Sequence, residues 1–411
     1  MMIRRRNIVV ALDVGTSNIK AALGEISYEH GVTVLGVTHT PSNGIRKGNI
    51  IDIDSTARAI DLCLSELERL TGMEIADALV GFSGASVNAI KNHAIIAAGN
   101  PNYEISDEDK SRVLKSACNI ALPPDKAIVQ TIETQYIVDG YDGVKDPVGM
   151  AGSRLEAEVV IIIAAAAALQ NLQRSIQRVN LHINQIVYNP LLVAEAVLLP
   201  AEKEIGVALI DIGGGTTEIS VFDGNSLVFT SVLPVGEEFI TRDLAIVLRT
   251  SLEEAARIKE EYGTVLMEPA GEDEFIEVRN IQGGEVKQVS LQTVTDIIYA
   301  RVEEIIAMIT AEIELSGYAG KLPAGIVLSG GGAQIAGIIQ VMENIMKLPV
   351  RSGTPDNISC LTADINKPQN AAILGGLMYA SHSTVIEEME KSQNLGNSFN
   401  RVSAWFKELF S

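Results

Sequence analysis

The hydrophobic pattern of the chain repeats one unit three times: a run of apolar residues followed at once by a Gly-rich polar turn. These units cover residues 7–26, 206–222 and 324–342. In the first two, the turn contains Asp-x-Gly and leads into a second apolar segment, which predicts a β-hairpin. The third unit leaves its strand for an amphipathic helical pattern. The sequence therefore predicts an α/β fold that contains a duplicated element.

Other apolar patterns fill the space between these units. The run at 159–169 predicts a buried strand that passes directly into a helix. Ser106 and Asp109 occupy capping-box positions, so we expect a helix to begin there. The polar segment 381–398 has no clear period and is predicted to be a flexible linker. The further expected elements are a helix at 55–72, strands at 77–84, 127–138 and 155–163, two helices within 240–263, strands within 264–291 and a helix at 292–316.

Length and charge narrow the class of protein. A chain of 411 residues with 47% hydrophobic residues predicts two or more domains with sizeable cores. The chain has 52 acidic and 32 basic residues, a net charge of −20, so we expect no nucleic-acid partner. Cys63, Cys118 and Cys360 lie far apart without a CxxC, which predicts neither a disulfide framework nor a zinc site and suits a reducing cytoplasm.

The first two polar turns carry the chemistry of a phosphate site. An Asp at the end of a strand can face a hydrated Mg²⁺, Gly lets the backbone approach an anion, and hydroxyl and amide groups add donors. Lys20 can either face the anion or lie along the following strand. The candidate residues of the first turn are Asp13, Gly15, Thr16, Ser17, Asn18 and Lys20. Those of the second are Asp211, Gly213, Gly214, Gly215, Thr216 and Thr217.

The third turn adds a second kind of anion site. Gly330, Gly331 and Gly332 open a helical pattern, where N–H groups and the helix dipole favour phosphate. One Asp-x-Gly turn alone is most often an ordinary hairpin, but three Gly-rich turns that all end apolar strands favour a nucleotide clamped from opposite sides. The chain has no GxxxxGK[ST], and no GxGxxG follows its first strand. These absences argue against a P-loop protein and a dinucleotide-binding fold.

The order of the three turns resembles the actin superfamily of ATP-binding proteins and, within it, the FtsA family of bacterial cell-division proteins. The stretch IVDGYDGVKDPVGMAGSRLEAEV is the most specific, since it belongs to an insertion that DnaK-type chaperones and the filament protein MreB lack. The resemblance covers nearly the whole chain. The matching stretches are residues 80–87, 137–159, 205–222, 233–255 and 326–337.

The resemblance implies an actin-like ATPase fold with two pseudo-symmetric halves around a nucleotide cleft, an inserted subdomain IC and a C-terminal amphipathic helix. The implied divisions are subdomain IA at 1–84 and 161–204, IC at 85–160, IIA at 205–239 and 304–380, IIB at 240–303, the linker at 381–398 and a membrane-targeting helix at 399–411.

The resemblance also implies roles for single residues, with ATP and Mg²⁺ as cofactors. Asp13 and Asp211 would hold Mg²⁺ through water, with Glu218 as a third carboxylate. The three glycines 330–332 would pass beside the ribose and α-phosphate, and Gly236 would also contact the nucleotide. Lys259 would approach the adenosine, although a solvated helix face is the alternative for it. Ala256 departs from the family pattern, because many relatives carry a Glu there that can hold the ribose or adenine.

Hydrolysis is expected to be slow or negligible. Active ATPases of this superfamily often place Glu or Gln near the attacking water, before a Pro that starts a helix. The residue at that position is Asn189, which is one methylene shorter than Gln and cannot act as a base. A displacement of about 1 Å in a catalytic group can cost ~10²-fold in rate. The sequence predicts a nucleotide-controlled switch rather than an efficient enzyme.

The last dozen residues form an amphipathic pattern that contains the only Trp. At 100° per residue, the apolar side chains of 399–411 fall within an arc of roughly 140°. The segment could instead dock on the protein's own globule or on a partner protein. Trp and Phe with flanking Lys and Arg favour an interfacial membrane helix. FtsA proteins carry such a helix at this position. Its membrane-facing residues would be Phe399, Val402, Trp405, Phe406, Leu409 and Phe410.

The resemblance implies an ATP-binding protein of the division ring that polymerises on the cytoplasmic side of the cell membrane. Its partners would be the tail of FtsZ, further copies of itself, membrane lipid and other division proteins. Arg301 and Glu304 match the family positions that contact FtsZ, with a solvated helix face as the alternative. Two alternative functions are an actin-fold sugar kinase and a PilM-like pilus adaptor. Neither of these proteins needs a terminal membrane helix.

Overall fold

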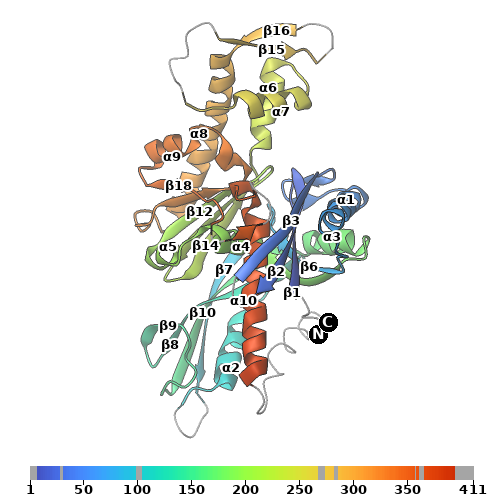
Figure 1. The fold of residues 1–411 in the computed structure, drawn as a ribbon. Helices are drawn as coiled ribbons and strands as arrows, with labels where there is room; N and C mark the ends of the chain where they lie inside the picture. Colours follow the sequence, from blue (N-terminus) through green and yellow to red (C-terminus); the bar gives the residue numbers. More distant parts are fainter. Residues whose placement is uncertain are drawn as a thin grey trace.

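The computed structural model describes residues 7–27, 31–98, 104–266, 274–281, 286–356, 358–360 and 365–393. Two sheets of one design form the centre of the molecule (Figure 1). Each is an antiparallel three-stranded meander that gains two parallel strands on the side of its first strand. In the first sheet, a further short parallel strand pairs with the third strand. The duplicated hairpins and the actin-like α/β fold predicted from the sequence are therefore confirmed.

The first sheet has six strands and packs helices on both faces. Val10 and Leu12 of β1 lie in one core with α1, whereas Ala11 lies in another with α10, because alternate residues of a strand face opposite sides. The strands, in spatial order, are β11 (His182–Tyr188), β6 (Asp77–Phe82), β1 (Asn7–Val14), β2 (Asn18–Ser27), β3 (Gly31–Pro41) and β19 (Ser359–Cys360). The associated elements are α1 (Ile53–Thr71), α3 (Ala166–Gln177), α4 (Asn189–Val197), α10 (Ala371–Gln393), β4 (Ile45–Arg46) and β5 (Asn49–Ile50).

The second sheet has five strands and shares a core with α6, α7, α8 and α9. The strands, in spatial order, are β14 (Ser226–Leu233), β13 (Thr217–Asp223), β12 (Val207–Ile212), β17 (Ile326–Ser329) and β18 (Val350–Ser352). The helices are α5 (Pro200–Ile205), α6 (Glu238–Leu248), α7 (Leu252–Tyr262), α8 (Leu291–Leu315), α9 (Ile338–Met346) and the short 3₁₀ turns η1 (Gly331–Gln334) and η2 (Pro368–Asn370). A small hairpin, β15 (Phe275–Arg279) with β16 (Val286–Ser290), lies beside α6 and α7 at one end of the molecule (Figure 1).

A third sheet lies largely within the predicted insertion at 85–160, and its strand β10 continues to Ala165. Its order is β7 (Asn88–Ala97), β10 (Arg154–Ala165), β8 (Lys126–Val138) and β9 (Tyr141–Val144), with α2 (Asp107–Cys118) packed against β7 and β10. The predicted capping box begins α2: the N–H of Asp109 donates to Ser106 Oγ at 3.2 Å, and the N–H of Ser106 donates to Asp109 Oδ2 at 3.1 Å. Val113, Tyr136 and Leu155 belong to a separate core here.

The predicted linker at 381–398 is wrong in its first part. The helix α10 continues to Gln393, so only 394–398 lie outside the described residues. The physical reason is that Glu, Met, Lys and Gln have high intrinsic helix propensity. The strands β3 and β7 were not predicted.

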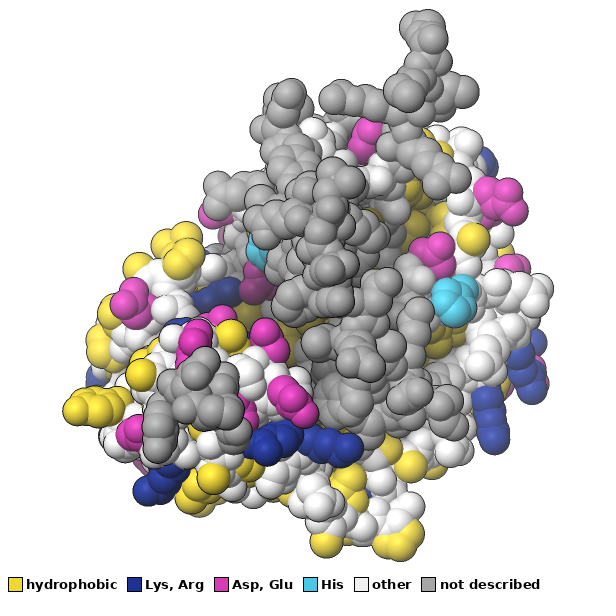
Figure 2. All heavy atoms as spheres, turned by 90° about the horizontal axis from the view of Figure 1, so that it is seen from below, with side chains coloured by type: hydrophobic (Ala, Val, Ile, Leu, Met, Phe, Trp, Pro, Cys, Tyr) yellow, Lys and Arg dark blue, Asp and Glu magenta, His cyan; other side chains and the backbone are white. Residues whose placement is uncertain are grey.

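Among the residues that the structure describes, no helix is long and apolar enough to span a bilayer. Figure 2 views the molecule from the end that carries α2. On the described part of this face, Lys and Arg side chains are scattered among Asp and Glu, without a continuous basic patch.

Candidate functional site

The first two predicted turns face each other across the space between the two halves. A Cβ on Gly215 would lie 2.7 Å from Thr16 Oγ1, and one on Gly214 would overlap the side chain of Ser17. Only glycine permits so close an approach of the two turns. The Asp-x-Gly turn at the end of β1 and the Gly-rich turn at the end of β12 therefore form one site.

Three carboxylates gather at the strand ends beside these turns. Asp13 is the second-last residue of β1, and Asp211 is the second-last residue of β12, opposite Glu218 in the hairpin register. Burial, followed by the neighbouring charges of Glu218 and Asp13, raises the pKa of Asp211 well above its ordinary value. Mutual repulsion of this kind is relieved by a bound cation.

Glu218 is the most deeply placed of the three, at 5% exposed. Burial raises its pKa to about 6, although hydroxyl donors oppose the shift. The donors are Ser83, 2.7 Å from Glu218 Oε1, and Thr216, 2.9 Å from the same oxygen. Ser83 belongs to the first half and Thr216 to the second, so this carboxylate joins the halves.

Asn189 lies beside Asp13, as the position before the helix-starting Pro predicts. It is the first residue of α4, and its Nδ2 donates to Asp13 Oδ1 at 3.0 Å. Its Oδ1 is buried and has no hydrogen-bond partner among the described residues. A buried acceptor without a donor costs roughly 1–3 kcal/mol. This oxygen packs against Gly81 of β6, where a Cβ would lie 2.0 Å from it.

Lys20 lies along β2, opposite Asp13. Its ammonium donates to the carbonyl of Gln369, in the turn that precedes α10. The neighbouring carbonyl of Pro368 accepts from Ser329 Oγ at 3.2 Å. The first hairpin and the strand before the third Gly-rich turn therefore both bind the start of α10.

Thr217, a predicted donor of the second turn, uses its hydroxyl in a contact within the second half. It is fully buried at the start of β13, and its hydroxyl donates to the carbonyl of Val235 at 2.9 Å. This hydroxyl therefore links the start of β13 to the segment before α6. Thr16, by contrast, accepts from the N–H of Gly48 at 2.9 Å.

The third turn and the start of α6 complete the site. Gly330 has a φ of 84° and Gly331 begins the short 3₁₀ helix η1, so the predicted helix is a single turn before α9. Gly236 directly precedes the N-cap of α6. Lys259 of α7 is only 14% exposed and pairs with Glu237 at 3.2 Å, so its side chain does not lie on a solvated helix face.

Two acidic residues of this site were missed from the sequence. Glu237 pairs with Lys259, and Glu238 Oε1 accepts from Ser17 Oγ at 2.9 Å. The available signal was their position directly after Gly236, but a Glu at the start of a helix is common for reasons of charge alone.

The site residues fit a hydrated divalent cation with phosphate. Within the described residues, no group of three His, Cys, Asp or Glu side chains is placed to ligate a metal directly. The carboxylates of Asp13, Asp211 and Glu218 provide negative charge in a partly buried space, and hydrated Mg²⁺ binds such groups through its water. The turn N–H groups and hydroxyls of the facing hairpins suit the phosphates.

Arg301 and Glu304 lie on α8, outside this site. Arg301 Nε donates to Asp243 Oδ2 at 2.6 Å and its Nη2 donates to Asp243 Oδ1 at 3.0 Å. Arg301 also pairs with Glu304 and lies over the ring of Phe239, 5.8 Å from its centroid. Arg301 is therefore held against α6 rather than extended into solvent.

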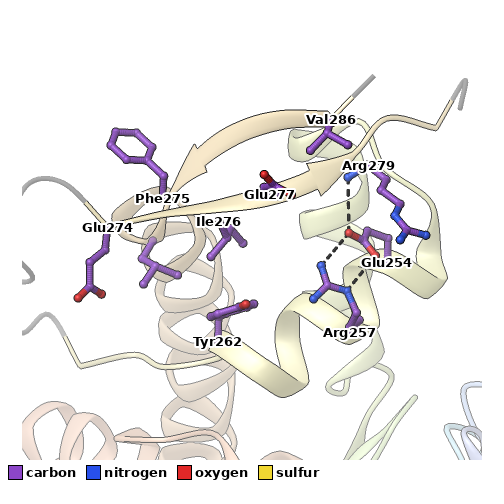
Figure 3. Close-up of a pocket in the computed structure, with 10 residues that line it drawn as sticks. Glu254, Arg257, Tyr262, Glu274, Phe275, Ile276, Glu277, Arg279 and Val286 are labelled. Atoms are coloured by element: carbon purple, nitrogen blue, oxygen red, sulfur yellow. Dashed lines mark hydrogen bonds and ion pairs between the residues drawn. The ribbon is translucent and has the colours of Figure 1, made fainter. Parts of the chain in front are cut away.

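Two cavities lie away from the facing turns and were not predicted. The first, of about 880 Å³, lies between α7, the β15–β16 hairpin and the start of α8 (Figure 3). Arg257 pairs with Glu254 there at 2.8 Å. The second, of about 720 Å³, lies between the inserted sheet and the β13–β14 turn. The candidate membrane residues 399–411 lie outside the described residues.

Comparisons with known proteins agree with this architecture. The family model described as "Cell division protein FtsA" matches residues 208–375, and "SHS2 domain inserted in FTSA" matches 84–163. The chain is 35% identical to Cell division protein FtsA of Pseudomonas aeruginosa, over 90% of this chain and 89% of the relative. It is 37% identical to that of Bacillus subtilis, over 92% and 85%.

Solved structures with little sequence identity share the fold. The PilM–PilN type IV pilus biogenesis complex matches with a TM-score of 0.64 and 15% identity, over 91% of this chain and 98% of that one. MreB 5 of Spiroplasma citri bound to AMPPNP matches with a TM-score of 0.58 and 14% identity, over 95% and 99%. At this level of identity the likeness concerns the fold alone.

Proposed function

The chain belongs to the FtsA family of cell-division proteins, and from this premise we propose that it is an ATP-binding, actin-like tether of the division ring. It polymerises on the inner face of the cytoplasmic membrane and holds FtsZ filaments there. The family membership favours this function over the pilus-adaptor and sugar-kinase alternatives. The observation that carries the nucleotide part of the proposal is the meeting of two Gly-rich turns beside three carboxylates.

ATP would lie between the two halves. Thr16, Ser17 and the glycines of the second turn would donate to the phosphates. Asp13 and Asp211 would hold the water shell of Mg²⁺, and bound Mg²⁺ supplies the positive charge that the phosphates and carboxylates share. Asn189 orients Asp13 through the 3.0 Å hydrogen bond. Calorimetric titration with Mg-ATP tests this part directly.

The site also has a physical connection to the C-terminal segment. Lys20 and Ser329 bind the two carbonyls that precede α10. The helix then packs against α4, which begins at Asn189, and runs toward the end of the molecule that carries the inserted sheet (Figure 1). A change at the phosphate turns can therefore act on the helix that leads to residues 399–411.

Membrane attachment would come from that C-terminal helix. The globule carries a net charge of −20, and the described part of the face in Figure 2 has no continuous basic patch. Six partly immersed apolar side chains supply roughly 6–10 kcal/mol, whereas ordering each backbone residue costs about 1–2 kcal/mol. One copy then binds weakly, and several copies in a filament bind firmly because each later helix inserts at high effective concentration.

We expect slow turnover by the wild-type protein. Asn189 binds Asp13 and offers only an amide near the phosphates, so no general base occupies this position. Phosphate release should stay well below about 1 s⁻¹, and Asn189→Gln, whose amide reaches farther, should raise it. Asn189→Ala serves as the control and should remain slow. Hydrolysis on the order of 1 s⁻¹ or faster in the wild type would show that the water-positioning group lies elsewhere.

The FtsZ tail would bind beside α8 through Arg301. Arg301→Glu should weaken the binding of an acidic FtsZ tail peptide at least tenfold, because a charge-assisted contact is worth roughly 1.5–3 kcal/mol. Fluorescence anisotropy with a labelled peptide measures the change.

The control for this experiment addresses the structural role of Arg301. Asp243→Ala removes the partner that holds Arg301 against α6 but keeps the guanidinium. If Arg301 contacts the peptide, this variant should bind as well as the wild type or better. Equal loss of binding in both variants would assign the effect to the α6–α8 contact, and no loss in Arg301→Glu would remove Arg301 from the interface.

A further inference from the structure

Glu237 occupies an unusual position between the second and third Gly-rich turns. Its N–H donates to the carbonyl of Gly213 at 2.9 Å. Its carboxylate lies over Gly331, where a Cβ would be 3.1 Å from Glu237 Oε1. The residue therefore connects the two turns that line the second half of the cleft.

Capping does not explain this side chain. Glu237 is the N-cap residue of α6, yet it makes no side-chain capping hydrogen bond. Instead Oε2 accepts from Lys259 Nζ at 3.2 Å, and the two side chains are only 21% and 14% exposed. The carboxylate is thus fixed from α7, with its other oxygen directed over the third turn.

The second oxygen remains available for a ligand. Among the described residues, no hydrogen bond to Glu237 Oε1 is formed, whereas the adjacent Glu238 accepts from Ser17. The side chain is 21% exposed, so water can donate to this oxygen in the free protein, and a donor group of a ligand can replace that water. A neutral hydroxyl or amino group would donate to this oxygen without charge repulsion.

The chemistry of a nucleotide selects which of its groups can lie there. A carboxylate repels phosphate, so Glu237 suits the uncharged part of the ligand. The sugar of a ribonucleotide carries two hydroxyl donors, and the third turn is where the sugar is expected in the proposed function. Ala256, one helical turn before Lys259 on α7, offers no polar group. Glu237 is therefore the carboxylate that this side of the cleft provides.

We propose that Glu237 accepts a hydrogen bond from a ribose hydroxyl of the bound nucleotide, and that Lys259 holds it in place for this purpose. The inference rests on the proposed ATP-binding function and extends it to sugar specificity. It makes the cleft selective for ribonucleotides over nucleotides that lack the bonded hydroxyl. A site built to bind a hydroxyl discriminates against its absence, because the acceptor is then left without a donor.

Calorimetric titration of the full chain with Mg-ATP, Mg-2′-deoxyATP and Mg-3′-deoxyATP tests this proposal. The wild type should bind ATP roughly tenfold or more tightly than at least one deoxy analogue. Glu237→Ala should weaken ATP binding by a similar factor while leaving that analogue unchanged, so that the ratio of affinities approaches one. Glu237→Gln, which keeps an acceptor oxygen and most of the volume, should give an intermediate ratio.

Glu260→Ala is the matched control, because it removes an exposed carboxylate from α7 and should retain the wild-type ratio. A merely structural role of Glu237 would weaken all three nucleotides alike. Tight ATP binding with equal affinities in the wild type, or a ratio that survives in Glu237→Ala, would overturn the proposal alone. Failure of the wild type to bind any of the three would overturn the ATP-binding function as well.

Discussion

The Trp405→Glu variant is expected to stay in solution when the wild-type protein sediments with liposomes. Trp405 lies at one edge of the apolar arc of 399–411 and is its largest side chain, so the substitution places a charge on the face that would enter the interfacial layer. The substitution also removes a large apolar side chain, whose burial is worth roughly 1.5–3 kcal/mol. Because one copy of the helix is expected to bind weakly, attachment should be abolished.

A second variant and the fluorescence of Trp405 serve as controls for the Trp405→Glu experiment. Lys407→Glu changes the polar face of the same segment and should weaken attachment modestly, mainly on anionic lipid. Trp405 is the only Trp, so its emission should shift to the blue when wild-type protein meets liposomes. An emission that is already blue-shifted without lipid, and does not change with it, would place the segment against protein and contradict the membrane role.

The second large effect is expected at Asp211. Asp211→Ala should reduce Mg-ATP affinity by at least tenfold, because it removes one of the carboxylates that hold the hydrated cation. The raised pKa means that ionised Asp211 is less favourable in the folded protein than in the unfolded chain. Its ionisation therefore lowers stability progressively as pH rises from the unfolded pKa through the folded one. At pH 7 without nucleotide, the variant should be as stable as the wild type or more so.

Thermal unfolding separates these two effects. Wild-type protein should gain stability with Mg-ATP, by about 2.7 kcal/mol at a concentration of 100 Kd. Asp211→Ala should lose most of this gain at the same concentration. Asp223→Ala, at the exposed far end of the same hairpin, should retain it. An unchanged calorimetric affinity in a folded Asp211→Ala variant would remove this residue from the cation site.

The two hairpins could be predicted from the sequence because residues close together in the chain specify them. Asp-x-Gly after an apolar run specifies a strand end and a tight turn within a few residues. The capping box of α2 is likewise contained in four residues. β7 was missed because NAIKNHAIIA alternates without a strongly apolar face, and most of its side chains are exposed or half-buried. The helix α10 was not predicted, and 381–393 was predicted to be part of a flexible linker because that segment has helix propensity without a clear period.

The site was predictable only where its residues lie in the turns themselves. Asp13 and Asp211 follow from strand ends, and the Pro after Asn189 marks the start of α4. Ser83 and Glu238 come from other elements, and only the tertiary fold brings them to Glu218 and Ser17. Their roles depend on contacts across more than a hundred residues, which no local pattern contains.

Co-sedimentation of FtsZ filaments with liposomes tests the tether most directly. The measurement compares FtsZ alone, FtsZ with the wild-type chain and Mg-ATP, and FtsZ with the Trp405→Glu variant and Mg-ATP. We predict that FtsZ sediments with the liposomes only when the wild-type chain is present. FtsZ that remains in the supernatant while the wild-type chain itself sediments with the liposomes would contradict the tethering function.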